Sequence, residues 1–177
     1  MNNLEILLIG NPILNLLSYV FVVLLMFNLL KVNYFNPIVA LFLKVYEPIS
    51  KILFLFQNQI INIIIISVII KFVSLFVFFL GEQKEILTLF GLAVGQIFIV
   101  SLRVIFFAVI GGVIISWVAP NSSNPFLQLI EEMSYKALSP IRKHIPSAGG
   151  LDFSPLFILI LINLVESFLN GMLNPIV

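Results

Sequence analysis

Three ionisable side chains lie within long apolar stretches of this sequence, where a charge is costly. Lys71, Arg103 and Glu166 are each flanked by runs of Ile, Leu, Val and Phe. A charged residue at the centre of a bilayer costs about 2.5 to 3.5 kcal/mol on insertion scales, and such residues line ion or proton routes or pair with one another. One hypothesis is that these three residues line a polar route. In the other, Lys71 and Glu166 neutralise each other, and Arg103 reaches the interface or pairs with an asparagine.

Few other residues in the sequence are suited to catalysis or metal binding. There is no cysteine, which excludes a thiolate metal site and a cysteine nucleophile. His144 is the single histidine, which argues against a His-based metal centre or a Ser-His-Asp triad. Gly149 and Gly150 are followed by Leu-Asp, and the sequence has no phosphate-binding glycine motif. The prediction is a protein that is not an enzyme and has no catalytic residue, cofactor or metal.

The composition places these residues in a membrane protein. Of 177 residues, 61% are hydrophobic and 10% are charged, against roughly 25% charged in an ordinary soluble domain. Nine Lys and Arg against eight Asp and Glu leave a formal charge of +1. These values exclude a soluble globular domain, a disordered chain and a nucleic-acid binder with a basic face. They indicate an integral membrane protein that makes no direct contact with nucleic acid.

Four apolar stretches are long enough to cross a bilayer as helices, which takes about 20 residues. They cover residues of about 13–30, 60–80, 89–118 and 155–173. Because the runs lack the alternation of β-barrel strands, the predicted fold class is an all-α membrane protein with four transmembrane helices. Asn11–Pro12 and Ser154–Pro155 are predicted to begin the first and fourth spans, with Asn or Ser as the N-cap and Pro at the first helical position.

The cations predict how the spans are oriented. Six of them lie in the two long loops that follow the first and third spans: Lys31, Lys44, Lys51, Lys136, Arg142 and Lys143. The loop on the opposite side contains Lys84 as its only cation. By the positive-inside rule, the long loops are cytoplasmic and both termini lie outside. The second and fourth spans then run in the same direction, which puts Lys71 and Glu166 at similar depths.

An Asn-Pro pair occurs twice and indicates an internal repeat. Asn36–Pro37 and Asn124–Pro125 are 88 residues apart, about half the chain. Each pair follows a span and precedes an apolar-rich stretch, a later proline and another span. The sequence therefore predicts two tandem two-span repeats, residues 1–88 and 89–177, each with an interfacial connecting helix on the cytoplasmic side. The first copy is degenerate, because it lacks counterparts of the Pro-Ile-Arg-Lys run and the Gly-Gly segment of the second.

The stretch between the third and fourth spans is amphipathic, with the 3.6-residue period of a helix. One face consists of Phe126, Leu127, Leu129, Ile130, Met133, Ala137 and Leu138. The other consists of Gln128, Glu131, Glu132, Tyr135 and Lys136. The segment is too short and too charged to span a membrane, so three placements remain open. It is a capped loop helix packed on the ends of the spans, an interfacial helix that contacts lipid, or a surface that docks a partner.

The motifs around this helix resemble those of a known family. They are Trp117 at the end of the third span, then Asn124–Pro125, Pro140–Ile141–Arg142–Lys143, Pro146, Gly149–Gly150, Asp152 and Ser154–Pro155. In this order they resemble the YggT family of small bacterial membrane proteins, whose Gram-positive and plastid relatives are called YlmG. The resemblance implies a multi-pass protein of the bacterial inner (plasma) membrane without catalytic activity. It also implies a link to osmotic-stress tolerance and ion uptake, to cell division, or to plastid cytochrome maturation and nucleoid distribution.

These observations lead to two hypotheses about function. The first is a non-enzymatic organising or assembly factor of the YggT type, which acts through the surface formed by residues 124–155. Its partners are membrane lipids and a membrane protein or a second copy of the chain. The alternative is a small ion-conducting or ion-uptake-modulating protein that uses Lys71, Arg103 and Glu166. Small residues at Gly91, Gly95 and around Gly112 mark the third span as a packing helix, within the monomer or in a homodimer.

Overall fold

The computed structural model of the protein describes residues 11–52, 56–82, 84–145 and 152–173, and within these ranges the ordered elements are helices. The helices are α2 (Pro12–Leu29), α3 (Pro37–Ile52), α4 (Gln59–Phe78), α5 (Ile86–Val118), α6 (Pro125–Arg142) and α7 (Ser154–Leu173). Four of them, α2, α4, α5 and α7, are long and apolar enough to cross a membrane. They begin and end within three residues of the predicted spans, so the all-helical class and four helices capable of spanning a membrane are confirmed.

The Asn-Pro pair at the start of α2 is the predicted N-terminal cap. The Asn11 side chain accepts hydrogen bonds from the backbone N–H groups of Ile13, at 3.1 Å, and Leu14, at 3.4 Å. Pro12 occupies the first turn, where its missing N–H has no intrahelical partner to lose. Helix α7 begins at Ser154, as predicted, although the side chain that caps it is that of Asp152.

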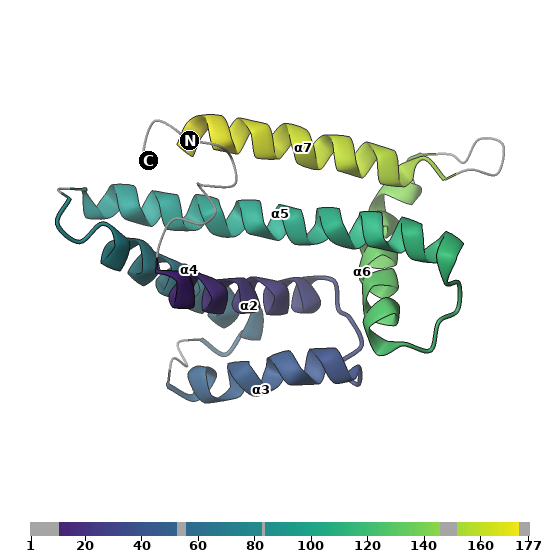
Figure 1. Ribbon diagram of the computed structural model, residues 1–177, viewed down its shortest axis with the longest axis horizontal. Helices are drawn as coiled ribbons and strands as arrows, with labels where there is room; N and C mark the ends of the chain where they lie inside the picture. Colours follow the sequence, from purple (N-terminus) through teal and green to yellow (C-terminus); the bar gives the residue numbers. More distant parts are fainter. Residues whose placement is uncertain (1–10, 53–55, 83, 146–151, 174–177) are drawn as a thin grey trace.

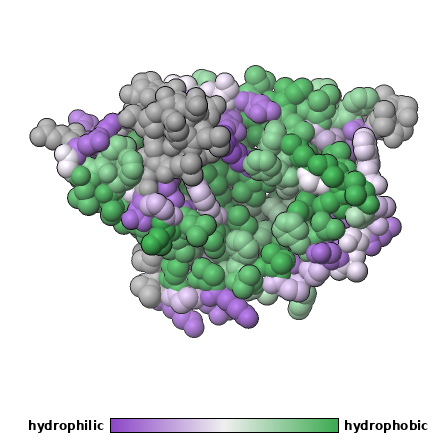
Figure 2. Space-filling view, viewed as in Figure 1, coloured by the Kyte–Doolittle hydropathy of each residue, from purple (hydrophilic) through white to green (hydrophobic). Residues whose placement is uncertain are grey.

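Helix α5 is the axis around which the other helices are arranged (Figure 1). Helix α7 lies along one side of α5, and α2 and α4 lie along the other. Helix α6 crosses α5 at a steep angle near its C-terminal end, whereas α3 runs back alongside α2. Figure 2 shows hydrophobic residues over most of this face of the molecule, with hydrophilic residues along its lower and right-hand edges, where α3 and α6 lie.

The two connecting helices therefore pack in different ways. Helix α3 buries Val39 and Tyr46 against α2 in the same hydrophobic cluster as Phe21 and Phe27. Helix α6 buries Leu129 in that cluster and Leu138 in a second one, against α5 and α7. The order of span, connecting helix and span occurs in each half of the chain. The tandem repeat and the interfacial placement of both connecting helices stay predictions.

Two glycines of α5 let α6 approach its backbone closely. A methyl group added at Gly112 would lie 2.3 Å from both Cβ and Oγ of Ser134 on α6. One added at Gly111 would lie 2.8 Å from a methyl group of Ile130. Gly95 has a similar relation to Leu173 of α7, at 2.8 Å. Gly95, Gly111 and Gly112 thus serve packing within the monomer, where a larger residue would hold the helices apart, whereas a methyl group at Gly91 would meet nothing within 4 Å.

The turn after α2 has the geometry of a Schellman motif. The N–H of Val32 donates to the carbonyl of Phe27 at 3.0 Å, and the N–H of Lys31 donates to that of Asn28 at 3.1 Å. Lys31 adopts the left-handed conformation that the motif requires, with a φ of 53°. The side chains of Phe27 and Val32 are buried together, which is the hydrophobic contact that accompanies the motif.

The polar face of α6 holds this turn in place. The Glu132 carboxylate accepts from the N–H of Asn33, at 3.0 Å to Oε1 and 3.1 Å to Oε2. The Lys136 ammonium donates to the carbonyl of Lys31 and forms an ion pair with Glu132 at 2.7 Å. Part of the polar face of α6 is therefore used inside the protein, to join its two halves.

Candidate functional site

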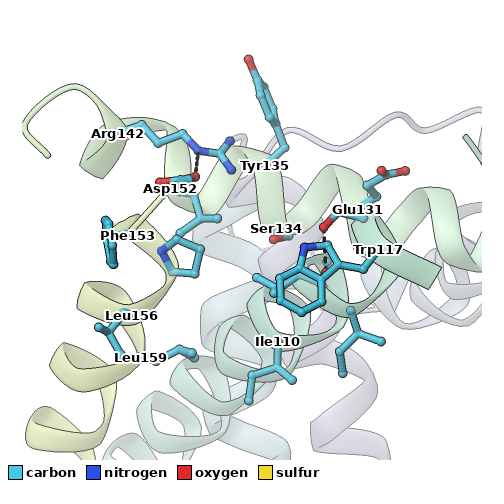
Figure 3. Close-up of a pocket in the computed structure, with 16 residues that line it drawn as sticks. Ile110, Trp117, Glu131, Ser134, Tyr135, Arg142, Asp152, Phe153, Leu156 and Leu159 are labelled. Atoms are coloured by element: carbon cyan, nitrogen blue, oxygen red, sulfur yellow. Dashed lines mark hydrogen bonds and ion pairs between the residues drawn. The ribbon is translucent and has the colours of Figure 1, made fainter. Parts of the chain in front are cut away.

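Four of the YggT-like motif residues, Trp117, Arg142, Asp152 and Pro155, line one groove between the C-terminal end of α5, helix α6 and the start of α7 (Figure 3). Its volume is about 630 Å³. The lining residues are Ile110, Gly112, Val113, Ile114, Ser116, Trp117, Glu131, Ser134, Tyr135, Leu138, Arg142, Asp152, Phe153, Pro155, Leu156 and Leu159. We call this the junction groove. The close approach of α6 at Gly112 fixes one of its walls, because Gly112 and Ser134 both belong to the lining.

An ion pair joins α6 to the start of α7 at one end of the junction groove. Arg142 Nε donates to Asp152 Oδ2 at 2.8 Å. The other oxygen of Asp152, Oδ1, accepts from the backbone N–H of Ser154 at 2.9 Å. Asp152 therefore caps α7 in place of the expected Ser154 side chain, and its negative charge lies at the positive end of the helix dipole. The pairing with Arg142 was not predicted from the sequence, although the two residues carry opposite charges ten positions apart.

The surroundings of Asp152 shift its titration. Burial raises the pKa of the carboxyl group, but the N–H of Ser154 and the Arg142 guanidinium favour the charged form more strongly, so the pKa is lowered below its ordinary value of 3.8. At a pH above the ordinary pKa of an aspartate, the charged carboxylate therefore makes its full contribution to the stability of the junction. This contribution is lost as the pH falls through the lowered pKa that Asp152 has in the folded protein.

Replacing Asp152 separates its two roles. We expect Asp152→Ala to lower the free energy of unfolding by about 1 kcal/mol, because both the cap and the ion pair are lost. Asp152→Asn keeps a capping oxygen and is expected to cost less than half of that. The measurement is chemical unfolding in detergent micelles at pH 7, followed by helical circular dichroism. Equal losses in the two variants would show that the cap contributes nothing. The gap between wild type and Asp152→Asn should close below pH 3.8.

Aromatic residues form the polar rim of the groove together with Arg142. The guanidinium carbon of Arg142 lies 5.3 Å from the centroid of the Tyr135 ring, within the range of a cation–π contact. Trp117 is 81% exposed, and its indole lies at the mouth of the groove, across from the Arg142–Asp152 pair (Figure 3). An exposed tryptophan at the end of an apolar helix is typical of the membrane–water interface.

The remaining motif residues that the structure describes belong to, or cap, two of the helices that form the groove. Asn124 caps α6 by accepting from the N–H of Phe126 at 2.9 Å, and the carbonyl of Pro125 accepts from the side chain of Asn36 at 2.8 Å. Ser154 is buried at the start of α7. The other positions are as follows: Pro140 and Ile141 lie in the last turn of α6, Lys143 is its exposed C-cap, Pro155 lines the groove, and Pro146, Gly149 and Gly150 lie outside the described residues.

The charges inside the spans pair differently from the expectation. Glu166 accepts from Arg103, at 2.8 Å from Nε and also from Nη2. Lys71 is 1% exposed and donates to the side-chain oxygen of Asn15, with the Tyr19 ring centroid 5.8 Å away. The predicted Lys71–Glu166 pair is thus corrected. The reason is that α5 lies between α4, which carries Lys71, and α7, which carries Glu166 (Figure 1). The partner within reach of Glu166 is therefore Arg103 on α5.

Two buried amides were missed by the sequence interpretation. Gln96 on α5 is 1% exposed and Asn170 on α7 is 5% exposed. Within the described part of the chain, neither the oxygen nor the nitrogen of either amide has a hydrogen-bond partner. Both amides lie near the end of the bundle that is opposite the junction groove. They are closer to that end than the Arg103–Glu166 pair is. The sequence could have identified them, because each is a polar residue within an apolar run, as Asn15 is.

The comparisons with known proteins agree with the location of the groove. Residues 91–173 match the model of the CCB3/YggT family. An uncharacterised protein of Pseudomonas aeruginosa is 48% identical over 65 residues, which are 37% of this chain and 33% of that protein. An uncharacterised protein of Haemophilus influenzae is 25% identical over 170 residues, which cover 92% of this chain and 90% of that protein. The chain thus matches a third of the first relative's length, and no solved structure matches it.

Proposed function

We propose that this chain, whose residues 91–173 match the model of the CCB3/YggT family, is a non-enzymatic organising or assembly factor of the bacterial inner membrane. It holds a membrane-protein partner or a second copy of itself at the junction groove and the adjoining face of α6. The long loops lie in the cytoplasm and the termini outside, which puts the groove at the cytoplasmic surface. Its physiological setting is osmotic-stress tolerance or the organisation of the envelope and of division.

One observation carries this proposal: four of the family motif residues come together at the junction groove. Trp117, Arg142, Asp152 and Pro155 all line it, although they come from three helices and a loop. Arg142 and Asp152 neutralise each other and cap α7, so they supply a rigid and specific surface. Such surfaces, with an exposed aromatic anchor and a polar rim, are suited to binding.

The test is complementation of a bacterial strain that lacks the protein, scored as survival after osmotic upshift. We expect Arg142→Ala/Lys143→Ala to lower survival at least tenfold at an unchanged protein level in the membrane. The matched control is Lys44→Ala/Lys51→Ala, which removes two exposed lysines from α3, away from the groove. A photo-crosslinking amino acid at position 117 should at the same time capture a specific protein. Wild-type survival in the Arg142→Ala/Lys143→Ala strain would overturn the proposal.

Ion conduction is the second candidate, and the buried amides of Gln96 and Asn170 favour it. Polar atoms enclosed in an apolar bundle are costly unless something binds them, and ordered water or a permeating ion would do so. Against it, Arg103 and Glu166 neutralise each other, and a selective pore has rings or chains of like groups. In liposomes that contain the purified protein, we expect no potassium or proton flux. A flux that Gln96→Leu abolishes would favour this second function.

A further inference from the structure

We infer that the protein dimerises in the membrane, with one flank of α7 packed against the same flank of a second copy. This flank is formed by Ile160, Asn163, Ser167 and Gly171, and we call it the α7 stripe. None of the four residues lines the junction groove, so the inference goes beyond the proposed function and does not depend on it. It rests on the depth and exposure of Asn163, on the spacing of the stripe and on the ion pair beside it.

Asn163 is a polar side chain exposed at the middle of a membrane-spanning helix. Helix α7 runs from Ser154 to Leu173, and Asn163 lies about 14 Å from either end. Its amide nitrogen donates to the carbonyl of Leu159 at 2.9 Å, and among the described residues it has no other hydrogen-bond partner. One N–H and the carbonyl oxygen of the amide therefore face hydrocarbon, where no water satisfies them. Asparagines in membrane helices bond across to a neighbouring helix, so the exposed amide indicates a neighbour outside the monomer.

The α7 stripe has the spacing of a helix–helix interface. Its residues follow one another at intervals of three or four positions, which places them on one flank of the helix, and all of them are exposed. A methyl group added at Gly171 would meet nothing within 4 Å, so another backbone is free to approach closely there. Small and polar residues of this kind are enriched where membrane helices pack. Helix α7 packs on α5 along its other side, at the edge of the bundle, and is the least buried of the four spans (Figure 1).

The Arg103–Glu166 ion pair lies at the edge of the α7 stripe. Glu166 follows Asn163 by three residues, which places it about 60° further around α7. The side chains of Arg103 and Glu166 are 23% and 14% exposed, so the monomer covers the pair only in part. Ionisable groups within membrane spans almost always face a protein interior or a water-filled cavity. A second copy on the stripe would add cover at this edge of the ion pair.

The chemistry of the stripe selects a second copy of this chain as its occupant. Copies inserted in the same orientation are related by a two-fold axis along the membrane normal, so identical residues meet at the same depth. A side-chain amide is both a donor and an acceptor, so Asn163 and Asn163 of the second copy satisfy each other. Arg103 and Glu166 neutralise each other, so this flank has no net charge that would select a partner of opposite charge.

Disulfide crosslinking tests the dimer directly, because the sequence contains no cysteine. Single cysteines are introduced into the full-length protein, which is reconstituted in phosphatidylcholine vesicles and oxidised with copper phenanthroline. We expect Ile160→Cys and Ser167→Cys, both on the stripe, to form disulfide-linked dimers. The matched controls are Leu161→Cys and Phe168→Cys, which are exposed at nearly the same depths but lie about 100° further around α7. They report random collision, and their dimer yield should be at least fivefold lower.

The critical variant is Asn163→Leu, combined with Ile160→Cys. It should lower the dimer yield by about fivefold, which corresponds to the loss of the interhelical hydrogen bonds. The helical circular dichroism should stay unchanged, because Asn163 bonds only its own helix within the monomer. The exchange variant Asn163→Leu/Leu164→Asn keeps the composition and the depth of the amide but turns it about 100° away from the stripe, and its yield should be as low. Asn163→Gln, which keeps a donor and an acceptor, should retain the dimer.

Several results would overturn the inference. Equal yields at the four cysteine positions would show random collision, and a higher yield at Leu161 or Phe168 would place the interface on another flank. A yield that Asn163→Leu leaves unchanged, or that the exchange variant restores, would show that the position of the amide does not matter. If the stripe binds a different membrane protein, the purified chain should show no excess at Ile160 and Ser167, which also contradicts the dimer.

Discussion

Replacing Gly112 by alanine is expected to lower the free energy of unfolding by about 2 to 3 kcal/mol. The added methyl group would lie 2.3 Å from Cβ and Oγ of Ser134, and although Oγ can rotate away, Cβ can move only if the backbone of α6 shifts. Overpacking of this kind typically costs about 1 to 3 kcal/mol, because backbones must shift to relieve it. Since α6 carries one wall of the junction groove, the same change should alter the emission of Trp117. Chemical unfolding in micelles, followed by circular dichroism and by Trp117 fluorescence, measures both effects.

The chain offers a matched control on the same helix. A methyl group at Gly91 would meet nothing within 4 Å, and Gly91→Ala is expected to be neutral or to stabilise α5 by up to about 1 kcal/mol. A rescue variant sharpens the test further. Ser134→Gly removes the two atoms that clash, so Gly112→Ala/Ser134→Gly should recover most of the lost stability. If Gly112→Ala were as stable as Gly91→Ala, the close approach of α5 and α6 would be wrong.

Breaking the Arg103–Glu166 pair from one side should be the most damaging change inside the bundle. Arg103→Leu or Glu166→Leu leaves one charge in a low-dielectric environment, at a cost of about 3 to 5 kcal/mol. Removing both charges together in Arg103→Leu/Glu166→Leu should recover most of that loss, because a neutral apolar pair needs no compensation there. Unfolding in micelles and the amount of folded protein extracted from the membrane give two readouts of these differences.

Asn163 provides the comparison for the ion pair. It lies one turn before Glu166 on α7, is exposed, and bonds only its own helix, at 2.9 Å to the carbonyl of Leu159. Asn163→Leu is therefore expected to change stability by less than about 0.5 kcal/mol. A double variant as unstable as either single variant would contradict the pairing of Arg103 with Glu166.

The sequence was sufficient for the features that depend on neighbouring residues. Apolar runs of the required length located the spans, and Asn11–Pro12 and Asn124–Pro125 located the starts of α2 and α6, because a cap is formed within one helical turn. The start of α7 was located for the same reason, although the capping side chain is that of Asp152 and not the expected Ser154. These are local interactions, whose partners are at most three residues apart.

Features that depend on which helices are neighbours could not be obtained in this way. The depths of Lys71 and Glu166 in their spans are similar, which suggested a pair, but depth does not reveal that α5 separates α4 from α7. The sequence left the placement of α6 open between packing on the ends of the spans, contact with lipid and docking of a partner. Glu132 contacts the N–H of Asn33 rather than solvent because of the direction in which α6 crosses the bundle. The helical periodicity of the sequence predicts the two faces of α6 but not this direction.

The contact between α6 and the turn after α2 has a consequence for how the chain is made. Asn33 leaves the ribosome about a hundred residues before Glu132, the side chain that accepts from its N–H. During that interval α2, α3 and α4 are already made, while the turn between α2 and α3 has no acceptor from α6. The first half of the protein is therefore completed by a residue of the second half. The contacts of Glu132 and Lys136 therefore form only after α6 has been made, and they join the turn after α2 to α6.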